Sequence, residues 1–179
     1  MASLRKASAY SKKKVRPFTR KAKTKKYAYI KAVPPLKLVK YNMGNVREHN
    51  RGNFKHIIRL IAGERVQLRD NAIEAGRMLL NKQLDEDLPG QYYLEVKVHP
   101  HHVLRDNKTA AGAGADRLSS GMTHSYGTNV GRAALVKPGK EIFMASCPDE
   151  NSLRVARKAF AMVKSKVPCR TSVISEKLA

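Results

Sequence analysis

"RDNAIEAGRMLLNKQLDEDLPGQYYLEVKV", residues 69–98, places a helical pattern directly before a strand pattern. Apolar residues recur at helical spacing as far as Leu84, which predicts an amphipathic helix. Asn71 and Glu74, three positions apart, predict a capping box at its start, and the acidic turn at residues 85–90 is expected to end it. The buried face of this helix is expected to carry Ile73, Gly76, Leu80 and Leu84.

The segments around this helix predict strands and one further helix. Residues 91–98 alternate apolar and polar side chains, which predicts a strand that buries Tyr92, Leu94, Val96 and Val98. Further strands are predicted at residues 36–41, 54–68 (one or two strands), 101–107, 132–137, 141–147 and 169–175. Pro138-Gly139 is typical of a hairpin turn, and residues 42–53 of a polar loop.

A second helix is predicted at residues 148–167, because the segment begins with acidic residues and ends with lysines, as the helix dipole favours. Its buried face is expected to carry Leu153, Ala156, Phe160 and Val163. Two main helices with mostly antiparallel strands predict the α+β class, in one layered domain.

Positive charge is the most unusual property of the composition. The 179 residues include 36 Lys and Arg against 14 Asp and Glu, a formal net charge of +22. Residues 1–40 hold 14 of the basic residues and none of the acidic ones. Such a balance needs a polyanion to neutralise it, so a nucleic acid is the expected partner. The pattern predicts a basic extended arm at residues 1–35 and a globular domain at residues 36–179.

Aromatic residues interleave with the cations of the arm, which favours an RNA-binding extension over a solvated tail, since rings stack on bases between phosphate contacts. An organellar transit peptide is a further interpretation, which the dominance of lysine and the Pro34-Pro35 pair disfavour. The residues expected to bind RNA are Arg5, Lys6, Lys12, Lys13, Lys14, Arg16, Arg20, Lys21, Lys23, Lys25 and Lys26 in the arm and Arg51, Arg69 and Arg77 in the domain.

The motifs that suggest metal binding each lack a required part. Cys147 and Cys169 have no CxxC spacing, so two free thiols are expected, as is usual in a reducing compartment. His101 and His102 are adjacent and face opposite sides of a strand, and His99 has no cysteine or carboxylate cluster near it in the sequence. We expect no metal and no cofactor.

The motifs that suggest catalysis are equally incomplete. The GAGADR stretch at residues 112–117 lacks the third glycine of a dinucleotide fingerprint. Ser119, Ser120 and His124 lack the strand–elbow–helix context of a hydrolase, and residues 85–87 are interpreted as a solvated helix end. No apolar run is long enough for a membrane span, and no signal peptide is expected. We expect no catalytic residue and no membrane partner.

Residues 105–122, RDNKTAAGAGADRLSSGM, contain small residues that can neither fill a core nor form a stable strand. Long loops inside domains are usually functional or disordered. Glycine allows close approach of the backbone to RNA, and Arg105, Lys108 and Arg117 supply charge. We expect a flexible loop at about residues 106–130, outside the core and between two strands.

Three stretches resemble one family: VQLRDNAIEAGRMLLNK at residues 66–82, VKVHPHHVLRDNK at 96–108 and AGAGADRLSSGM at 111–122. The family is the archaeal and eukaryotic large-subunit ribosomal protein of the ten-e type, the counterpart of bacterial large-subunit ribosomal protein sixteen. The archaeal form is the better match, and the likeness begins at about Arg16, in RPFTR.

The resemblance implies a non-catalytic, cytoplasmic protein of the ribosome that binds large-subunit rRNA and contacts neighbouring ribosomal proteins. It places the domain near the elbow and acceptor arm of A-site tRNA. It also implies that the loop at residues 107–127 reaches toward the peptidyl transferase centre and the acceptor end of P-site tRNA. The residues expected to face tRNA are Arg105, Asn107, Lys108, Gly112, Gly114, Asp116, Arg117, Gly121, Met122 and His124.

The chain departs from the family pattern on both sides of these motifs. Tyr10 lacks the cysteine that the family has beside it, and residues 20–30 carry extra lysines. After Met122, threonines stand where the family has an Arg and a Lys. A free-standing basic nucleic-acid chaperone or chromatin-type protein is the alternative interpretation; it explains the charge and the arm and leaves the loop unexplained.

Overall fold

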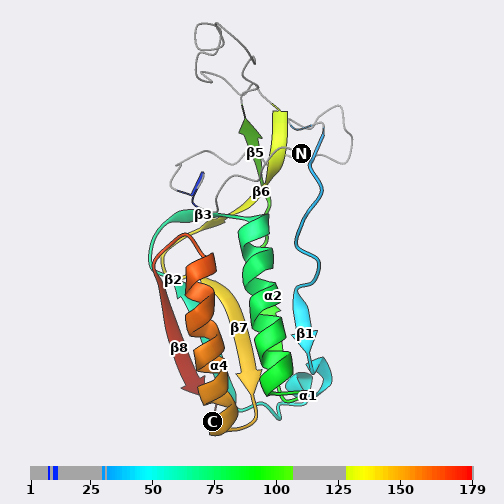
Figure 1. Ribbon diagram of the computed structural model, residues 1–179, viewed down its shortest axis with the longest axis vertical. Helices are drawn as coiled ribbons and strands as arrows, with labels where there is room; N and C mark the ends of the chain where they lie inside the picture. The colour runs from blue at the N-terminus through cyan, green and yellow to red at the C-terminus, as the bar shows by residue number, and fades with distance from the viewer. Residues whose placement is uncertain (1–7, 9, 12–29, 31, 107–127, 179) are drawn as a thin grey trace, which may run out of the picture.

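The computed structural model describes residues 8, 10–11, 30, 32–106 and 128–178, which form two β-sheets and three α-helices (Figure 1). The strands are β1 (Asn42–Gly44), β2 (His56–Ala62), β3 (Val66–Arg69), β4 (Tyr93–Val96), β5 (His102–Asp106), β6 (Thr128–Val136), β7 (Glu141–Cys147) and β8 (Thr171–Lys177). The helices are α1 (Val46–Asn50), α2 (Asp70–Asp87) and α4 (Glu150–Val163), with a 3-10 turn η2 (Lys164–Lys166). The predicted α+β class and its antiparallel strands are confirmed.

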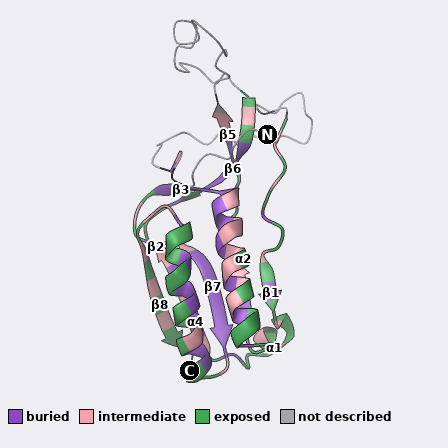
Figure 2. Ribbon diagram, in the orientation of Figure 1, coloured by how far each residue is buried: buried purple, intermediate pink, exposed green. Residues whose placement is uncertain are grey.

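A five-stranded antiparallel sheet forms the larger layer, in the order β1-β4-β7-β2-β8. Helices α2 and α4 lie side by side on one face of it (Figure 1). Strand β7 is central, pairs with β2 and β4, and is buried along nearly its whole length (Figure 2). The sheet therefore has one face shielded by helices whose outer sides are exposed.

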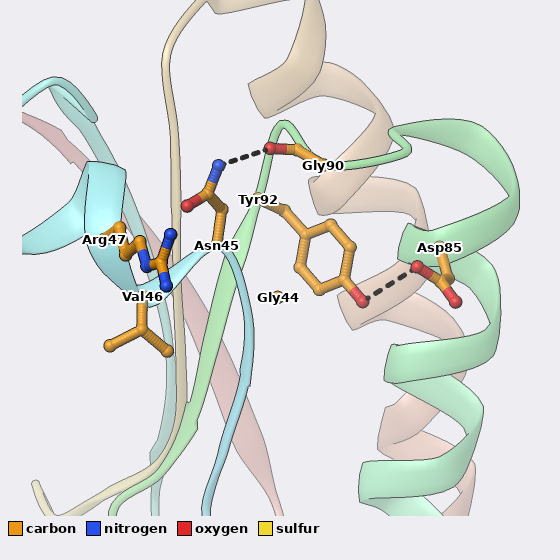
Figure 3. A pocket seen from close by; sticks show the side chains of 7 residues that line it. All are labelled: Gly44, Asn45, Val46, Arg47, Asp85, Gly90 and Tyr92. Carbon is orange, nitrogen blue, oxygen red and sulfur yellow. Dashed lines mark hydrogen bonds between the residues drawn. The ribbon is translucent and has the colours of Figure 1, made fainter.

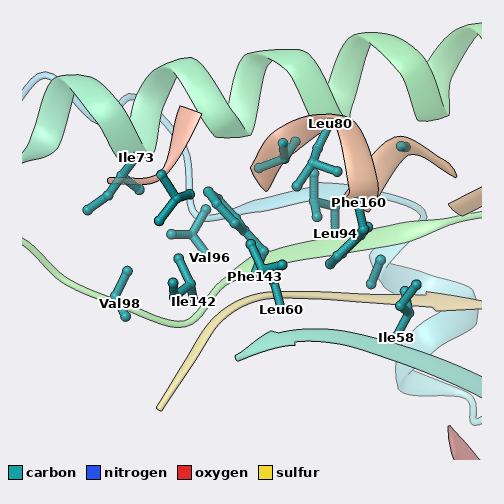
Figure 4. Packing of buried hydrophobic residues seen from close by; sticks show 14 of the residues in the cluster. Ile58, Leu60, Ile73, Leu80, Leu94, Val96, Val98, Ile142, Phe143 and Phe160 are labelled. Atoms are coloured by element: carbon teal, nitrogen blue, oxygen red, sulfur yellow. The ribbon is translucent and has the colours of Figure 1, made fainter. Parts of the chain in front are cut away.

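The main core lies between these helices and the sheet (Figure 4). Ile73 and Leu80 of α2 and Phe160 of α4 meet Phe143 and Leu60 of the sheet, and none of the five is more than 1% exposed. Full burial of side chains of this size stabilises by roughly 1.5–3 kcal/mol each. The two predicted helix faces are confirmed, because the structure buries Ile73, Gly76, Leu80, Leu84, Leu153, Ala156, Phe160 and Val163.

The opposite face of the sheet carries a smaller cluster beside α1. The His49 ring stacks on Tyr93, with ring centroids 4.0 Å apart, and His49 Nδ1 lies 2.8 Å from Ser146 Oγ. Asn45 caps the helix, since its Oδ1 accepts a hydrogen bond from Glu48 N at 3.2 Å. The short helix is therefore held by its cap and by one ring stack. The apolar residues of this cluster are Phe54, Ile57, Tyr93 and Met144.

A second, three-stranded sheet has the order β3-β6-β5. The hairpin predicted at Pro138-Gly139 is wrong, because β6 belongs to this sheet and β7 to the larger one. Gly139 N donates to Ala62 O at 2.8 Å, and Ala62 N donates to Lys140 O at 3.0 Å. The turn thus bonds to the end of β2, and the chain crosses from one sheet to the other there.

Two local predictions before β2 are also wrong. Residues 36–41 form no strand, because Lys37 N and Val39 N donate to the carboxylates of Asp70 and Glu74 in the first turns of α2. The predicted polar loop at residues 42–53 instead holds β1 and α1. Distant carboxylates decide the first outcome, and the pairing of β1 with β4 and the Asn45 cap decide the second.

The capping box predicted at the start of α2 is not formed. Arg69 occupies the cap position in an extended conformation and makes no capping bond through its side chain. Glu74 is instead engaged by Arg77, whose Nη2 lies 2.5 Å from Glu74 Oε1. A contact within the helix, together with the bond from Val39 N, therefore replaces the capping role predicted for Glu74.

Candidate nucleic-acid interface

Exposed cations cover the parts of the surface that the described residues form. Many of them have no carboxylate of the described residues within ion-pair distance. Such cations are available for phosphate, because neutralising them requires no exchange of an internal partner. They are Lys37, Lys40, Arg47, Lys55, Arg65, Lys137, Lys140, Arg157, Lys158, Lys164, Lys166, Arg170 and Lys177.

Four of these cations gather where the two sheets meet, and we call Arg65, Lys137, Lys140 and Arg170 the basic rim. The backbone brings them together: Gly63 N donates to Arg170 O at 2.8 Å, and the Ala62–Lys140 bond ties in the turn after β6. Their side chains lie on exposed residues of three separate connections. The rim is therefore built by tertiary structure, and no sequence motif marks it.

Strands β5 and β6 extend the second sheet away from the rest of the domain (Figure 1). They pair from His102 with Ala133 to Asp106 with Thr128, with an irregularity between Leu104 and Arg105. Residues 107–127 thus connect the far ends of two paired strands, and the flexible loop expected at about residues 106–130 stays a prediction.

Described residues of the predicted arm contact the second sheet. Gln67 of β3 donates through N to Ser11 O at 2.9 Å and through Nε2 to Tyr10 O at 2.8 Å. The guanidinium of Arg69 lies 5.8 Å from the centroid of the Tyr10 ring. Farther along, Arg132 Nε donates to Pro34 O at 2.8 Å. Contacts thus exist near both ends of residues 1–35, a feature that charge patterning does not reveal.

The three domain arginines predicted to bind RNA lie in different surroundings. Arg51 is exposed and pairs with Glu48 at 2.7 Å. Arg69 is buried beside Tyr10, and the Arg77 side chain is 11% exposed and pairs with Glu74. Internal contacts account for Arg69 and Arg77, and the assignment of all three to RNA stays a prediction.

Most other predicted site residues lie outside the described residues. Of the loop set, Arg105 on β5 is described and is half-buried. Outside lie the arm residues Arg5, Lys6, Lys12, Lys13, Lys14, Arg16, Arg20, Lys21, Lys23, Lys25 and Lys26. Outside also lie the loop residues Asn107, Lys108, Gly112, Gly114, Asp116, Arg117, Gly121, Met122 and His124.

The histidines after β4 form a ring ladder. His99 stacks on Tyr41 with centroids 5.7 Å apart and an interplanar angle of 11°, and His101 lies 6.2 Å from His99. His102 turns inward, and its burial, with a smaller effect of His101, lowers its pKa below the ordinary value. Among the described residues no three His, Cys, Asp or Glu side chains gather as a metal site.

The Ser–His contact and the two cysteines of the described region are poorly suited to nucleophilic chemistry. Ser146, beside His49, is 0% exposed, so this Ser–His contact offers no route to a substrate. Both cysteines are free, as expected, and burial raises the pKa of Cys147 to about 12 and that of Cys169 to about 11. A thiol with so high a pKa carries almost no thiolate and is unreactive near neutral pH.

An open hollow of about 520 Å³ lies between the start of α1 and the end of α2 (Figure 3). Asn45 Nδ2 donates to Gly90 O at 3.3 Å across it, and the Tyr92 hydroxyl donates to Asp85 at 3.4 Å. Burial and Asp85 raise the pKa of Tyr92 to about 12, so this phenol stays neutral. The hollow combines Arg47 with Asp85 and lacks an activated nucleophile.

These features define a class: a basic α+β protein whose exposed cations suit nucleic acid and whose outer strands carry a long connection away from the core. The described region contains no helix that has both the length and the apolar character to cross a bilayer.

The chain belongs to the ribosomal protein L16p/L10e family, whose model matches residues 14–174. It is 37% identical to the large ribosomal subunit protein uL16 of Pyrobaculum arsenaticum over 97% of this chain and 92% of the relative. The uL16 proteins of Hyperthermus butylicus (40% identity, 90% of this chain, 87% of the relative) and Staphylothermus marinus (38%, 98% and 95%) are similar relatives. The resemblance found in the sequence to an archaeal large-subunit ribosomal protein is confirmed.

Proposed function

We propose that this chain is a structural protein of the large ribosomal subunit in the cytoplasm, where it binds rRNA and helps to position tRNA near the peptidyl transferase centre. Membership of the L16p/L10e family carries the ribosomal assignment. It gives no support to the alternative of a free-standing chaperone or chromatin-type protein. Neighbouring ribosomal proteins are further expected partners.

The distribution of cations supports binding to folded RNA. Exposed lysines and arginines occur on α4, on η2 and at the basic rim, so they are spread over several elements of the domain. A protein that reads one groove of a duplex concentrates its contacts on one element, whereas a protein surrounded by RNA distributes phosphate contacts widely. The arm would add its own cations to this surface.

The proposed contact with tRNA depends on the β5–β6 ladder. A paired ladder gives residues 107–127 two fixed attachment points at a distance from the core. We assign the tRNA-facing role to this segment, toward the P-site acceptor end, and place the domain near the elbow and acceptor arm of A-site tRNA. The composition of the segment, small and glycine-rich with Lys108 and Arg117, suits close approach to RNA.

A role without catalysis is part of the proposal. In the described residues, the one serine in contact with a histidine is fully buried, and both cysteines carry raised pKa values. Placement of RNA by hydrogen bonds and charge needs neither a nucleophile nor a cofactor.

Sedimentation tests the ribosomal assignment. The tagged chain should remain with large subunits through a high-salt wash in a sucrose gradient, whereas release into the soluble or DNA fraction would contradict the proposal. Deletion of residues 110–120 should leave folding and subunit association intact and impair tRNA-dependent steps. A global loss of stability on deletion would show that the segment belongs to the core.

A further inference from the structure

A second hollow, of about 350 Å³, adjoins the basic rim, and we infer that it receives a single unpaired nucleotide of the bound RNA. Its volume lies at the lower end of the roughly 300–1,000 Å³ of small-molecule sites. The inference rests on the proposed function, since it names the form of RNA that one part of the surface binds. The hollow is lined by Lys97, Val98, His99, Ala134, Leu135, Lys137 and Lys140.

The lining combines the two properties that a nucleotide needs. Val98, Ala134 and Leu135 are apolar, and Leu135 is 43% exposed, so a flat base gains apolar contact there. Lys137 and Lys140 are exposed and have no carboxylate of the described residues within ion-pair distance, so both charges are available for phosphate. An apolar surface with cations on one side matches a base attached to its phosphates.

His99 supplies a ring whose position is already fixed. One stack holds it against Tyr41, and Tyr41 is itself anchored because its carbonyl accepts a hydrogen bond from Val96 N at 2.9 Å. A ring that is ordered before binding loses little conformational freedom on stacking with a base. His99 is exposed and lines the hollow, so a base bound there can contact the ladder of Tyr41, His99 and His101.

One of the three lysines that line the hollow has an internal partner among the described residues, and the other two have no carboxylate there within ion-pair distance. Lys97 pairs with Glu95 at 2.7 Å, and its backbone N donates to Ile142 O at 3.0 Å, so it forms a fixed wall. Lys137 and Lys140 flank the turn that bonds to Ala62, and they also belong to the basic rim. An RNA backbone that crosses the rim therefore passes the mouth of the hollow. A nucleotide without a pairing partner is the form of RNA that can turn its base inward there.

Two RNA hairpins of the same stem, one fully paired and one with a single-nucleotide bulge, test the inference with the full-length chain. The chain should bind the bulged hairpin about five-fold tighter or more, the factor expected when one base stacks on a protein ring. His99→Ala should abolish this preference and His99→Phe, which keeps a ring, should retain it. A wild-type chain with no preference, or an unchanged preference in His99→Ala, would overturn the inference.

A second double variant of the same chain serves as a control for the variant that lacks Lys137 and Lys140. Lys137→Ala/Lys140→Ala should weaken binding of the bulged hairpin more than binding of the paired one, and reduce the slope of log affinity against log salt by about two. Lys158→Ala/Lys164→Ala removes two other exposed lysines, on α4 and η2, and should affect both hairpins alike. An equal effect of the two double variants would count against the hollow.

The outcomes separate this inference from the ribosomal assignment. A chain that sediments with large subunits and shows no bulge preference keeps its proposed function and loses this site. A chain that fails to sediment with them loses the proposed function, whatever its preference among hairpins.

Discussion

Gly44→Ala should destabilise the domain far more than Gly52→Ala, although both glycines have the same backbone conformation. Both have a φ of +79°, where a Cβ costs about 1–2 kcal/mol. They lie just before and just after α1, so they also belong to the same part of the fold. The comparison therefore holds the backbone strain constant.

The atoms around the two glycines account for the expected difference in stability between the two variants. A Cβ at Gly44 would lie 2.3 Å from the backbone oxygen of Tyr92 and 2.9 Å from its ring, whereas a Cβ at Gly52 meets no atom within 4 Å. That oxygen accepts the hydrogen bond from Asn45 N at 2.8 Å, so a shift that relieves the clash would weaken this bond at the end of the β1–β4 ladder. Forced overpacking costs about 1–3 kcal/mol. The expected destabilisation is about 1–2 kcal/mol for Gly52→Ala and about 2–5 kcal/mol for Gly44→Ala.

Urea denaturation followed by far-UV circular dichroism measures both values. With a slope of about 2 kcal/mol per molar urea, the midpoint should fall by about 0.5–1 M for Gly52→Ala and by about 1–2.5 M for Gly44→Ala. Equal slopes would show that the change lies in stability and not in the extent of unfolding. Equal midpoints for the two variants would refute the steric argument, because strain would then explain the whole effect.

Three other perturbations test contacts described above. Arg77→Met should lower the free energy of unfolding by about 1–3 kcal/mol at neutral pH. Because Arg77 lowers the pKa of Glu74, the stabilisation from this pair is lost as pH falls, so the variant should lose less stability below pH 4.5 than the wild type. The same loss of stability in acid for both chains would contradict this. Burial lowers the pKa values of His49 and His102, so the free energy of unfolding should fall as pH drops below about 6.5. His49→Phe should reduce that fall, and a fall of the same size in the variant would contradict the role of His49. Cys147 should react with Ellman's reagent only after unfolding in urea, and rapid reaction of the folded chain would disprove its burial.

Local periodicity was sufficient to predict the two long helices, α2 and α4, and the central strands. Leu80 and Phe160 lie in stripes at helical spacing, and Leu94 and Val96 in the alternating strand, because burial on one face imposes that spacing. The predicted hairpin was wrong because residues far away in the sequence, and not the local pattern, determine how β7 pairs. Pro138-Gly139 specifies a turn, but the partner of β7 is set by Ala62 and β2, which lie far away in the sequence.

The candidate interface was less predictable than the fold. The net charge indicates an RNA partner, yet Arg65, Lys137 and Arg170 become neighbours only through backbone bonds between three connections. Arg69 and Arg77 show the converse, since their residue type suggests RNA contact and the structure gives them internal partners. The bonds from Gln67 to Tyr10 and Ser11 carry no sequence signal, because they involve the backbone of the arm.

The crossing between the sheets has a mechanical consequence. Strand β6 passes through residues 137–140 directly into β7, which, like β2 and β4, has partners on both sides in the larger sheet. A pull on the outer end of β6 is therefore resisted by two ladders of hydrogen bonds in shear, whereas an edge strand such as β8 has one. A force applied to the second sheet is therefore transmitted through the Ala62–Lys140 junction to the middle of the larger sheet.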